Sequence, residues 1–424
     1  MQLTQDIFVF PATEVGGYIV YAPLYRVCFR TNEYTAKQFR EALIMDDLDA
    51  DHRVSKEILQ RIAEIRNCEK ITPSDGDALF GTDLSVILSQ RCNLACTYCY
   101  AKDAHSDQVL DFNVLKKCVD FVIDYPVNKT KRFTFIGGGE PTLTWPLLRE
   151  SIEYIRNRNC EQKVNCSVVT NGTLLTKEKL DFFYKNQVRI VLSFEILKQV
   201  QDIQRPLASG RSSFERVSEA LTYIKQSGVT CDCIRSTITN LNVEDMTLMV
   251  QQLAENYSFI RYVDLEPVTD KNNTKDFYDR YINNFFETKR YGESVGITVY
   301  NSVSSSLSSV KTRFCRREFC LTPTGEIVCC HRVSSSNDSL FNTFLIGKVT
   351  SNSIEIDENK IELLSAIKTN FKECSNCFAK YNCAGGCLSE RLGVPQTHEA
   401  KCYFTKKMLS LQLEEEMNKH LYHE

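Results

Sequence analysis

Residues 91–100 read RCNLACTYCY and hold three closely spaced cysteines, Cys92, Cys96 and Cys99. They follow the apolar run LSVILS, a predicted strand, and so lie where an open sheet of alternating strands and helices binds its ligands. Three thiolates can hold three irons of a four-iron cubane and leave the fourth iron open for another ligand. Structural zinc usually takes four protein ligands. The spacing therefore favours an iron–sulfur cluster over zinc or over unreactive buried thiols.

Around this stretch, strands and helices alternate from residue 84 to residue 266. Six short apolar or β-branched runs begin near residues 84, 132, 165, 189, 231 and 260, with amphipathic stretches between them. This order predicts an α/β fold with a parallel sheet covered by helices. Six units rather than eight predict a partial (β/α)6 barrel over residues 83–267, with its catalytic groups at the carboxyl ends of the strands.

Three further regions flank this barrel. Residues 1–70 contain three short strands between Pro and Gly turn signals, followed by two helical stretches, and predict a small α+β domain. Residues 268–312 are polar, and we expect them to bridge to the last region. In residues 313–424 the cysteines cluster again ahead of a final helix, which predicts a cysteine-rich domain.

The composition limits which classes of partner the protein is expected to bind. The formal net charge of the 424 residues is -3, and no basic stripe stands out, which argues against nucleic acid. No apolar run approaches the roughly 18 residues that span a bilayer, and the first residues lack the features of a signal peptide. We therefore expect a cytoplasmic protein with no membrane partner. In a reducing compartment, clustering among the 19 cysteines indicates metal rather than disulfides.

A glycine motif follows the second predicted strand, where residues 137–141 read GGGEP. Glycines let the backbone approach a ligand closely. Together with the Cys-x3-Cys-x-aromatic-Cys pattern, this motif resembles the radical S-adenosylmethionine (SAM) superfamily. The resemblance implies a SAM-binding [4Fe-4S] cluster on the three cysteines and Tyr98 near the adenine. It also implies that the segment comprising Gly138, Gly139, Glu140 and Pro141 lies near the SAM amino group.

Two later segments extend this resemblance. VVTNGTLL resembles the third-strand motif of the family, and SFEILKQVQDIQRP resembles its fourth-strand serine–acid segment. By this resemblance Ser193 contacts the SAM ribose, and Arg205 or Arg211 pairs with the SAM carboxylate. Many relatives have a serine-leucine-aspartate-glycine string where this chain reads SFEI, so Glu195 and Ile196 depart from the pattern. A plain strand end and a surface arginine are the alternative interpretation.

The downstream cysteines form a second constellation, with Cys-x2-Cys-x5-Cys-x3-Cys from residue 374 to residue 387. They resemble the SPASM extension of radical SAM enzymes, which holds two auxiliary [4Fe-4S] clusters. The resemblance assigns Cys315, Cys320, Cys330 and Cys387 to the first cluster, and Cys374, Cys377, Cys383 and Cys402 to the second. Cys329 is a rival to Cys330, although the spacing from Gly325 favours Cys330. A zinc ribbon is the alternative, and His331 is either a ligand or an ordinary loop residue.

Two acidic residues end the sixth predicted strand, Asp264 and Glu266. At the mouth of the barrel either carboxylate is placed to take or give a proton. The alternative for each is a structural salt bridge.

The family resemblance implies reductive cleavage of SAM, with electrons from a flavodoxin or ferredoxin, and hydrogen abstraction by a 5′-deoxyadenosyl radical. SPASM relatives mostly modify peptides or proteins. Residues 1–70 resemble the winged-helix element that captures the leader of a ribosomal precursor peptide as an edge strand. We therefore expect a peptide maturase that forms a thioether, ether or carbon–carbon cross-link. The alternatives are a formylglycine-forming sulfatase maturase, a peptide epimerase, and a non-catalytic iron–sulfur or zinc protein.

Overall fold

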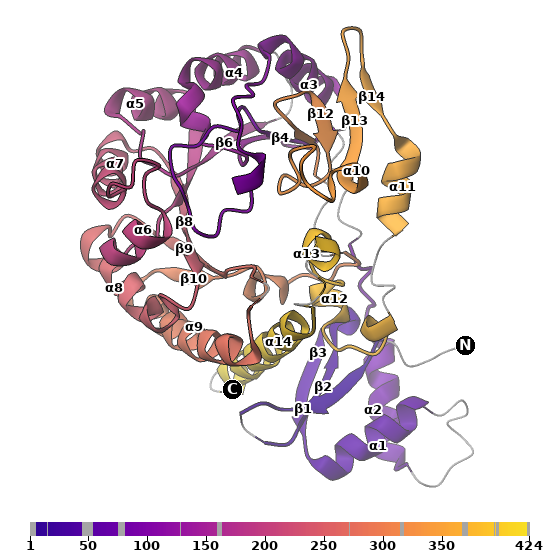
Figure 1. Cartoon of the computed structure of the whole chain (residues 1–424). Coiled ribbons are helices and arrows are strands. Elements are labelled where there is room, and N and C mark those ends of the chain that lie inside the picture. The colour runs from indigo at the N-terminus through magenta and orange to yellow at the C-terminus, as the bar shows by residue number, and fades with distance from the viewer. Residues whose placement is uncertain are drawn as a thin grey trace.

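The computed structural model describes residues 6–14, 16–44, 54–74, 81–127, 129–158, 163–270, 272–313, 318–366, 372–393, 395 and 398–421. Figure 1 shows a curved sheet with a ring of helices on its outer side. A smaller module from the N-terminus lies below this ring, and the C-terminal region closes its open side.

The expected partial barrel is present, and its six strands are parallel to their neighbours throughout. The strands are β4 (Asp83–Val86), β5 (Lys131–Phe135), β6 (Val164–Thr170), β7 (Val188–Ser193), β8 (Cys231–Ile238) and β9 (Tyr262–Pro267). The covering helices are α3 (Phe112–Asp124), α4 (Trp145–Asn157), α5 (Lys177–Lys185), α6 (Lys198–Gln204), α7 (Phe214–Ser227) and α8 (Met246–Asn256).

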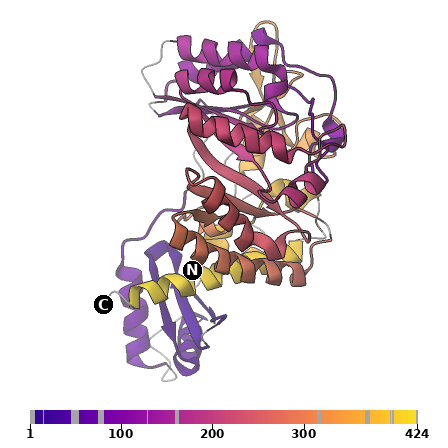
Figure 2. The ribbon, with the colours of Figure 1, turned by 90° about the vertical axis from the view of Figure 1, so that its left-hand side faces the viewer.

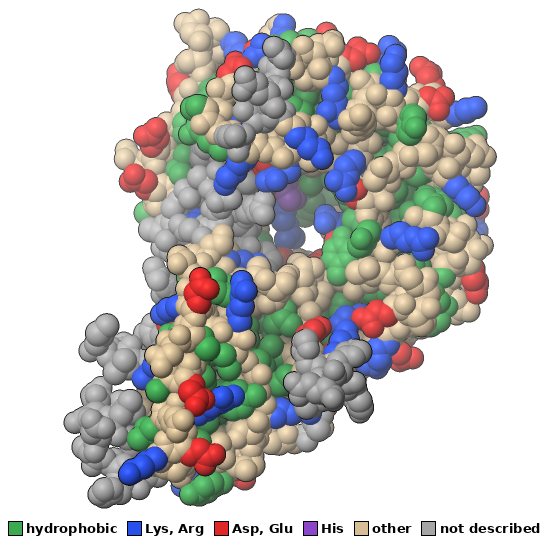
Figure 3. Space-filling model, turned by 180° about the vertical axis from the view of Figure 1, so that it is seen from behind, with side chains coloured by type: hydrophobic (Ala, Val, Ile, Leu, Met, Phe, Trp, Pro, Cys, Tyr) green, Lys and Arg blue, Asp and Glu red, His purple; other side chains and the backbone are tan. Residues whose placement is uncertain are grey.

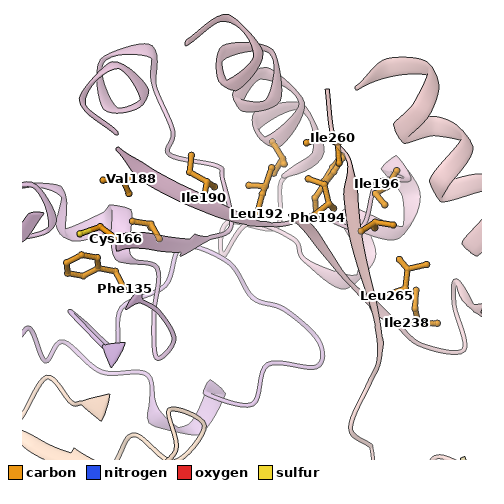
Figure 4. Close-up of a cluster of buried hydrophobic side chains, with 14 of the residues drawn as sticks. Phe135, Cys166, Val188, Ile190, Leu192, Phe194, Ile196, Ile238, Ile260 and Leu265 are labelled. Atoms are coloured by element: carbon orange, nitrogen blue, oxygen red, sulfur yellow. The ribbon is translucent and has the colours of Figure 1, made fainter. Parts of the chain in front are cut away.

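Burial of one strand face drives this packing. Side chains such as Phe135, Ile190 and Leu192 point from the sheet toward the helices and are fully buried (Figure 4). Local signals fix the helix ends: the Asp111 side chain accepts from the backbone N–H of Asn113 and begins α3, while Gly228 ends α7 in the left-handed conformation. The polar faces of the same strands turn toward the inside of the barrel, where a ligand has room to bind.

The sheet extends beyond the six predicted strands at both edges. After α9 (Lys275–Val295), β10 (Thr298–Tyr300) pairs in parallel with β9. At the other edge β11 (Cys320–Leu321) pairs in parallel with β4, and three antiparallel partners follow, β12 (Glu326–Val328), β13 (Leu345–Val349) and β14 (Ile354–Ile356). The result is one sheet of 11 strands, to which both the expected bridge and the cysteine-rich region contribute.

The N-terminal module is a three-stranded antiparallel sheet of β1 (Phe8–Pro11), β2 (Tyr18–Ala22) and β3 (Val27–Thr31), followed by α1 (Glu33–Ile44) and α2 (Lys56–Asn67). One face of the sheet packs on these two helices, with Val20, Phe39 and Ile62 at the centre. The other face packs on the C-terminal region through Ile19 and Leu413.

The C-terminal region is built of short helices and one long one. They are α10 (Phe341–Phe344), α11 (Glu358–Ala366), α12 (Lys380–Cys383), α13 (Leu388–Gly393) and α14 (His398–Leu421). Short 3-10 turns are η1 (Pro23–Tyr25), η2 (Lys102–Ala104), η3 (Pro141–Thr144), η4 (Val243–Asp245), η5 (Ser304–Ser306) and η6 (Lys372–Cys374). Helix α14 lies between the barrel helix α9 and the N-terminal sheet (Figure 2). Across the described residues, no helix combines the length and apolar character that crossing a bilayer requires.

Candidate active site

One cavity of about 960 Å³ opens at the carboxyl ends of the barrel strands. Figure 3 shows the molecule hollowed at its centre, with Lys and Arg side chains near the opening. The barrel forms one wall of the cavity, and the cysteine-rich region forms the other. The predicted site residues that line it are Cys92, Cys96, Tyr98, Cys99, Gly138, Gly139, Glu140, Ser193, Arg205, Asp264, Glu266, Cys330, Cys383, Cys387 and Cys402.

The glycine motif holds the start of the cysteine loop. The backbone N–H of Gly139 donates to the Ser89 carbonyl at 2.9 Å, and that of Glu140 donates to the Arg91 carbonyl at 2.7 Å. A Cβ added at Gly139 would lie 1.7 Å from the Arg91 carbonyl oxygen, so only glycine fits there. The two sequence motifs are thus one structural unit, in which GGGEP fixes the backbone directly before Cys92.

The Glu140 side chain lines the cavity and is held by hydrogen bonds from neighbouring protein groups. It is 3% exposed, and its Oε1 accepts from the Thr142 N–H at 3.1 Å and the Thr170 hydroxyl at 2.6 Å. Its Oε2 accepts from the Asn171 N–H at 2.7 Å. The carboxylate therefore ties η3, which begins at the buried Pro141, to the end of β6. Its neighbour Gly138 adopts the left-handed backbone conformation, with a φ of 65°.

A buried polar network connects Tyr98 to the fourth barrel strand. The Tyr98 hydroxyl donates to Glu195, and Arg205 Nη1 donates to the Tyr98 oxygen at 2.9 Å. Glu195 is fully buried and also accepts from the Ser236 hydroxyl at 2.5 Å and the Thr237 N–H at 3.0 Å. Burial raises the pKa of Glu195, although Arg205 and these hydrogen bonds oppose the rise. Glu195, which departs from the family pattern, thus positions Tyr98 and Arg205.

The donor set around the cysteine loop fits SAM. Arg205 Nε is buried and has no hydrogen-bond partner among the described residues, so it is placed to bind an anionic group such as a carboxylate. Ser193 lines the same cavity. Arg211 does not: its Nε donates to the Ser209 hydroxyl at 3.3 Å on the exposed surface. Of the two predicted arginines, the structure therefore favours Arg205 for the SAM carboxylate.

The three thiols of the cysteine loop match the three protein ligands of a cubane with one open iron. Within the described segments, no three His, Cys, Asp or Glu side chains converge as one metal ion would require. Tetrahedral zinc needs its thiolates about 2.3 Å from one centre. A cubane instead binds each thiolate to a different iron, so its ligands stand further apart.

The first auxiliary set is partly assembled. Cys320 lies in β11, while Cys329 and Cys330 directly follow β12. Burial raises the pKa of the Cys320 thiol well above its ordinary value, and the nearby Glu318, Cys330 and Cys329 raise it further. Cys329 and Cys330 both line the cavity together with Cys387. Cys315 lies outside the described residues.

The second auxiliary set gathers around α12 and the start of α14. Burial raises the pKa of Cys383 to about 12, and Cys402, Cys377 and Cys374 add to this rise because their charges are close. Of this set, Cys383 and Cys402 line the cavity. His398 Nε2 is 3.5 Å from Cys402 Sγ, a neighbour that the sequence patterns did not point to.

Comparison with known proteins agrees with this geometry. Residues 86–253 match the radical SAM superfamily. These residues, which span most of the barrel, form a radical SAM domain. A radical SAM domain implies a [4Fe-4S] cluster and SAM. A cysteine-type anaerobic sulfatase-maturating enzyme from Clostridium novyi is 24% identical over 333 residues, which are 70% of this chain and 85% of that protein.

Two solved structures share the fold. Native anSMEcpe with bound AdoMet and the Kp18Cys peptide matches with a TM-score of 0.65 at 19% identity, covering 80% of this chain and 99% of that one. Streptococcus suis SuiB bound to its precursor peptide SuiA matches with a TM-score of 0.55 at 14% identity. The SuiB match covers 92% of this chain and 96% of that one.

In this radical SAM fold, a carboxylate engages His331. Its Nδ1 lies 2.9 Å from Glu318 Oε2, and its backbone N–H donates to the same oxygen at 2.8 Å. Burial alone would raise the pKa of Glu318, but the charge of His331 and hydrogen bonds from His331 and Ser85 lower it to about 2. The sequence did not point to Glu318 as this partner.

The two acidic residues of β9 differ in their environments. Ser302 holds Glu266 through its backbone N–H, at 2.9 Å, and its hydroxyl, at 2.7 Å. Asp264 Oδ2 accepts from Arg235 Nε at 2.9 Å, while Asp264 Oδ1 is buried without a partner among the described residues. Only Asp264 therefore keeps a buried oxygen available at the cavity wall.

Proposed function

We propose that this radical SAM enzyme is a peptide maturase, which installs a thioether, ether or carbon–carbon cross-link on a ribosomally made precursor peptide. The observation that carries this proposal is the N-terminal module, a three-stranded sheet with an open edge packed against the cysteine-rich region. We place the reaction in the cytoplasm, where a flavodoxin or ferredoxin can supply electrons.

In this proposal Cys92, Cys96 and Cys99 hold the SAM-binding cluster, while Ser193 and Arg205 bind SAM. When bound, the cluster and SAM supply a 5′-deoxyadenosyl radical that abstracts hydrogen from the peptide. The chain itself orients these groups: GGGEP fixes the backbone before Cys92, and Glu195 holds Tyr98 and Arg205 in place. The buried position of this network keeps water away from the reacting groups.

The auxiliary cysteines would hold two more [4Fe-4S] clusters. Cys315, Cys320, Cys330 and Cys387 form the proposed first set, and Cys374, Cys377, Cys383 and Cys402 form the proposed second set. Cys330, Cys387, Cys383 and Cys402 line the same cavity as the SAM-cluster cysteines. Clusters held by these residues would supply an electron acceptor at the cysteine-rich wall of the cavity.

The edge of β3 supports binding of a leader peptide. No backbone group from another described segment bonds to the outer edge of β3, whereas Arg40 Nη2 already occupies the Val9 carbonyl of β1 at 3.2 Å. An added strand can satisfy the free edge through main-chain hydrogen bonds. SuiB, whose structure contains its precursor peptide, matches 92% of this chain, whereas anSMEcpe leaves a fifth of it unmatched.

The test is anaerobic reconstitution, followed by incubation with SAM, a reductant and synthetic peptides that correspond to short reading frames beside the gene. We expect 5′-deoxyadenosine and a peptide lighter by two hydrogens, with tandem mass spectrometry locating the bond. A C96A variant, which lacks one cluster ligand, is the control and should form neither. An unchanged mass with deuterium uptake from heavy water would indicate epimerisation instead.

Sulfatase maturation is the second candidate, because the Clostridium novyi relative carries that name and aligns with 70% of this chain. A synthetic sulfatase peptide with a target cysteine tests it directly. Conversion of that cysteine to an aldehyde, with no reaction of the precursor peptides, would favour this candidate over cross-linking.

A further inference from the structure

We propose that Asp264 is the proton acceptor in the bond-forming step and that Arg235 is its positioning residue. This inference rests on the proposed function, because it assigns a catalytic group to the same cavity. It also gives Asp264 a role that Glu266 does not share, although the sequence predicts the same role for both.

The geometry leaves one carboxylate oxygen of Asp264 for a substrate. Asp264 in β9 and Arg235 in β8 are register partners in neighbouring parallel strands, and both line the cavity. Arg235 Nε binds Oδ2 at 2.9 Å, which fixes the carboxylate. Oδ1 is buried and has no partner among the described residues, in a side chain that is only 7% exposed. A buried carboxylate oxygen without a donor costs free energy unless a ligand supplies one.

Every element packed around this carboxylate contributes a polar or titratable group. Strand β8 contributes Arg235 and Cys233, β9 contributes Glu266, β10 contributes Tyr300, and α9 contributes Tyr281. The Tyr281 hydroxyl is committed to the Leu265 carbonyl, and Glu266 is held by Ser302. Arg235 is the one cation among these neighbours, and it contacts only Oδ2.

The local charges suit a base that works near neutral pH. Burial raises the pKa of Asp264 to about 6, Arg235 lowers it, and the nearby Glu266 raises it again. At pH 7 the carboxylate is therefore mostly ionised, yet it is more basic than an exposed aspartate. A general base is most effective when its pKa lies near the working pH.

The proposed step is the formation of the new bond on the peptide. Hydrogen abstraction leaves a carbon radical on the peptide, and this carbon forms a bond to a sulfur, oxygen or aromatic carbon that carries one hydrogen. Forming that bond releases one proton and one electron. Asp264 Oδ1 accepts the proton, and an oxidised iron–sulfur cluster, as the one-electron oxidant, accepts the electron. The peptide therefore loses two hydrogens in total: one to 5′-deoxyadenosine, and one as this proton and electron.

A purely structural ion pair is the competing explanation, and the chain contains a matched control. Asp83 and Arg132 also pair across neighbouring parallel strands, with Arg132 Nη2 at 2.7 Å from Asp83 Oδ2. Asp83 Oδ1 is likewise buried without a partner among the described residues. This second pair lies at the opposite ends of β4 and β5 and does not line the cavity. D83N therefore reproduces the loss of a strand-to-strand pair without touching the cavity.

The experiment uses the reconstituted holoenzyme and a precursor peptide expressed in deuterated medium. We measure cross-linked product per 5′-deoxyadenosine and deuterium transferred to 5′-deoxyadenosine. For D264N we expect the product ratio to fall about 100-fold, while deuterium transfer persists because abstraction precedes proton loss. D83N should keep the ratio of the wild type. D264E should restore a measurable part of it, because a carboxylate is present again.

The pH profile supplies a readout that a structural role would not change. Since the base must be ionised, the wild-type product ratio should rise as the pH increases through about 6, and the residual ratio of D264N should lack this rise. A D264N ratio equal to that of the wild type, or loss of deuterium transfer in D264N, would overturn the assignment. If the wild type itself forms no product, the proposed function fails instead.

Discussion

At the scale of single residues, Tyr98 combines two roles, since its ring lies in the cysteine loop and its hydroxyl joins Glu195 to Arg205. Y98F keeps the ring but removes the hydroxyl, which leaves Arg205 Nη1 at 3.7 Å from Glu195 without the bridging group. Hydrogen bonds to charged groups contribute about 1.5–3 kcal/mol. We therefore expect SAM to bind about tenfold more weakly, as measured by anaerobic calorimetry.

The control for this prediction is Y184F, because Tyr184 is an exposed tyrosine of α5 that does not line the cavity. It should leave SAM affinity unchanged. If Y98F also binds SAM within twofold of the wild type, the hydroxyl bridge does not position Arg205.

Local spacing predicts the cysteine ligands, but it cannot predict what holds them. The spacing of Cys92, Cys96 and Cys99 is readable because it lies within one loop. The partner of Tyr98 at Glu195 is 97 positions away, and its partner Arg205 is 107 positions away. Such pairs form only when parallel strands bring distant loops to one edge of the sheet, so a single sequence contains no local trace of them.

At the scale of elements, the turn after β5 and the loop after β4 fold as one unit through Gly139. In G139A, the added Cβ would meet the Arg91 carbonyl oxygen at 1.7 Å and displace the backbone before Cys92. We expect iron incorporation to fall and the electron paramagnetic resonance change on SAM addition to disappear. Iron and sulfide analysis, together with this spectrum, measures the effect.

G210A is the matched glycine substitution, since Gly210 has open space around its Cβ position. Gly210 has a φ of 76°, so this change costs about 1 kcal/mol of backbone strain. Full iron–sulfur content in G210A, together with loss of iron and sulfide in G139A, would show that the clash of the added Cβ with Arg91 causes the effect. Normal clusters in both variants would contradict it.

The two edges of the N-terminal sheet should respond differently to a leader peptide. The outer edge of β3 is open in the described structure, whereas Arg40 covers part of the edge of β1. On addition of the precursor peptide we expect slower hydrogen–deuterium exchange over Val27–Thr31 and little change over Phe8–Pro11. A leaderless core peptide is the control and should protect neither strand. Protection of β1 alone would place the leader on the wrong edge.

Element prediction succeeded where patterns are long and failed where pairing is decided by tertiary contacts. The six barrel strands were predicted because apolar runs alternate with amphipathic helices over residues 84–266. Strands β10 and β11, which flank the six barrel strands, contain three and two residues, too few for a periodic pattern. Helix α9 returns the chain so that β10 pairs with β9, while the turn at Gly325 lets β12 pair with β11.

At the scale of the whole molecule, helix α14 connects the N-terminal sheet to the cavity. Its first turns carry Cys402 and Lys401 at the cavity wall. Further along, Glu414 is 2% exposed and accepts from the backbone N–H groups of Thr13 at 2.7 Å and Glu14 at 3.1 Å. Phe10 stacks on Phe378 with ring centroids 3.8 Å apart. The N-terminal sheet, our proposed binding site for the leader, is thus held at a fixed distance from the cavity. The cavity is our proposed site of core-peptide modification.

Because the N-terminal sheet is held against α14 in this way, a variant that weakens this contact should still bind the leader peptide but should modify the core peptide less. E414A removes the acceptor of two backbone N–H groups and should weaken the docking by about 1–3 kcal/mol. Leader affinity depends on β3 and should persist, and cleavage of SAM depends on the barrel and should also persist. Modification of the core peptide should fall, because a tethered core reaches the cavity at an effective concentration set by this geometry. Peptide binding by anisotropy and product by mass spectrometry separate the two effects.

E416A changes a half-exposed glutamate of the same helix and serves as the control. Equal product yields from E414A and E416A would show that the N-terminal module does not need to be held against α14 to deliver its peptide.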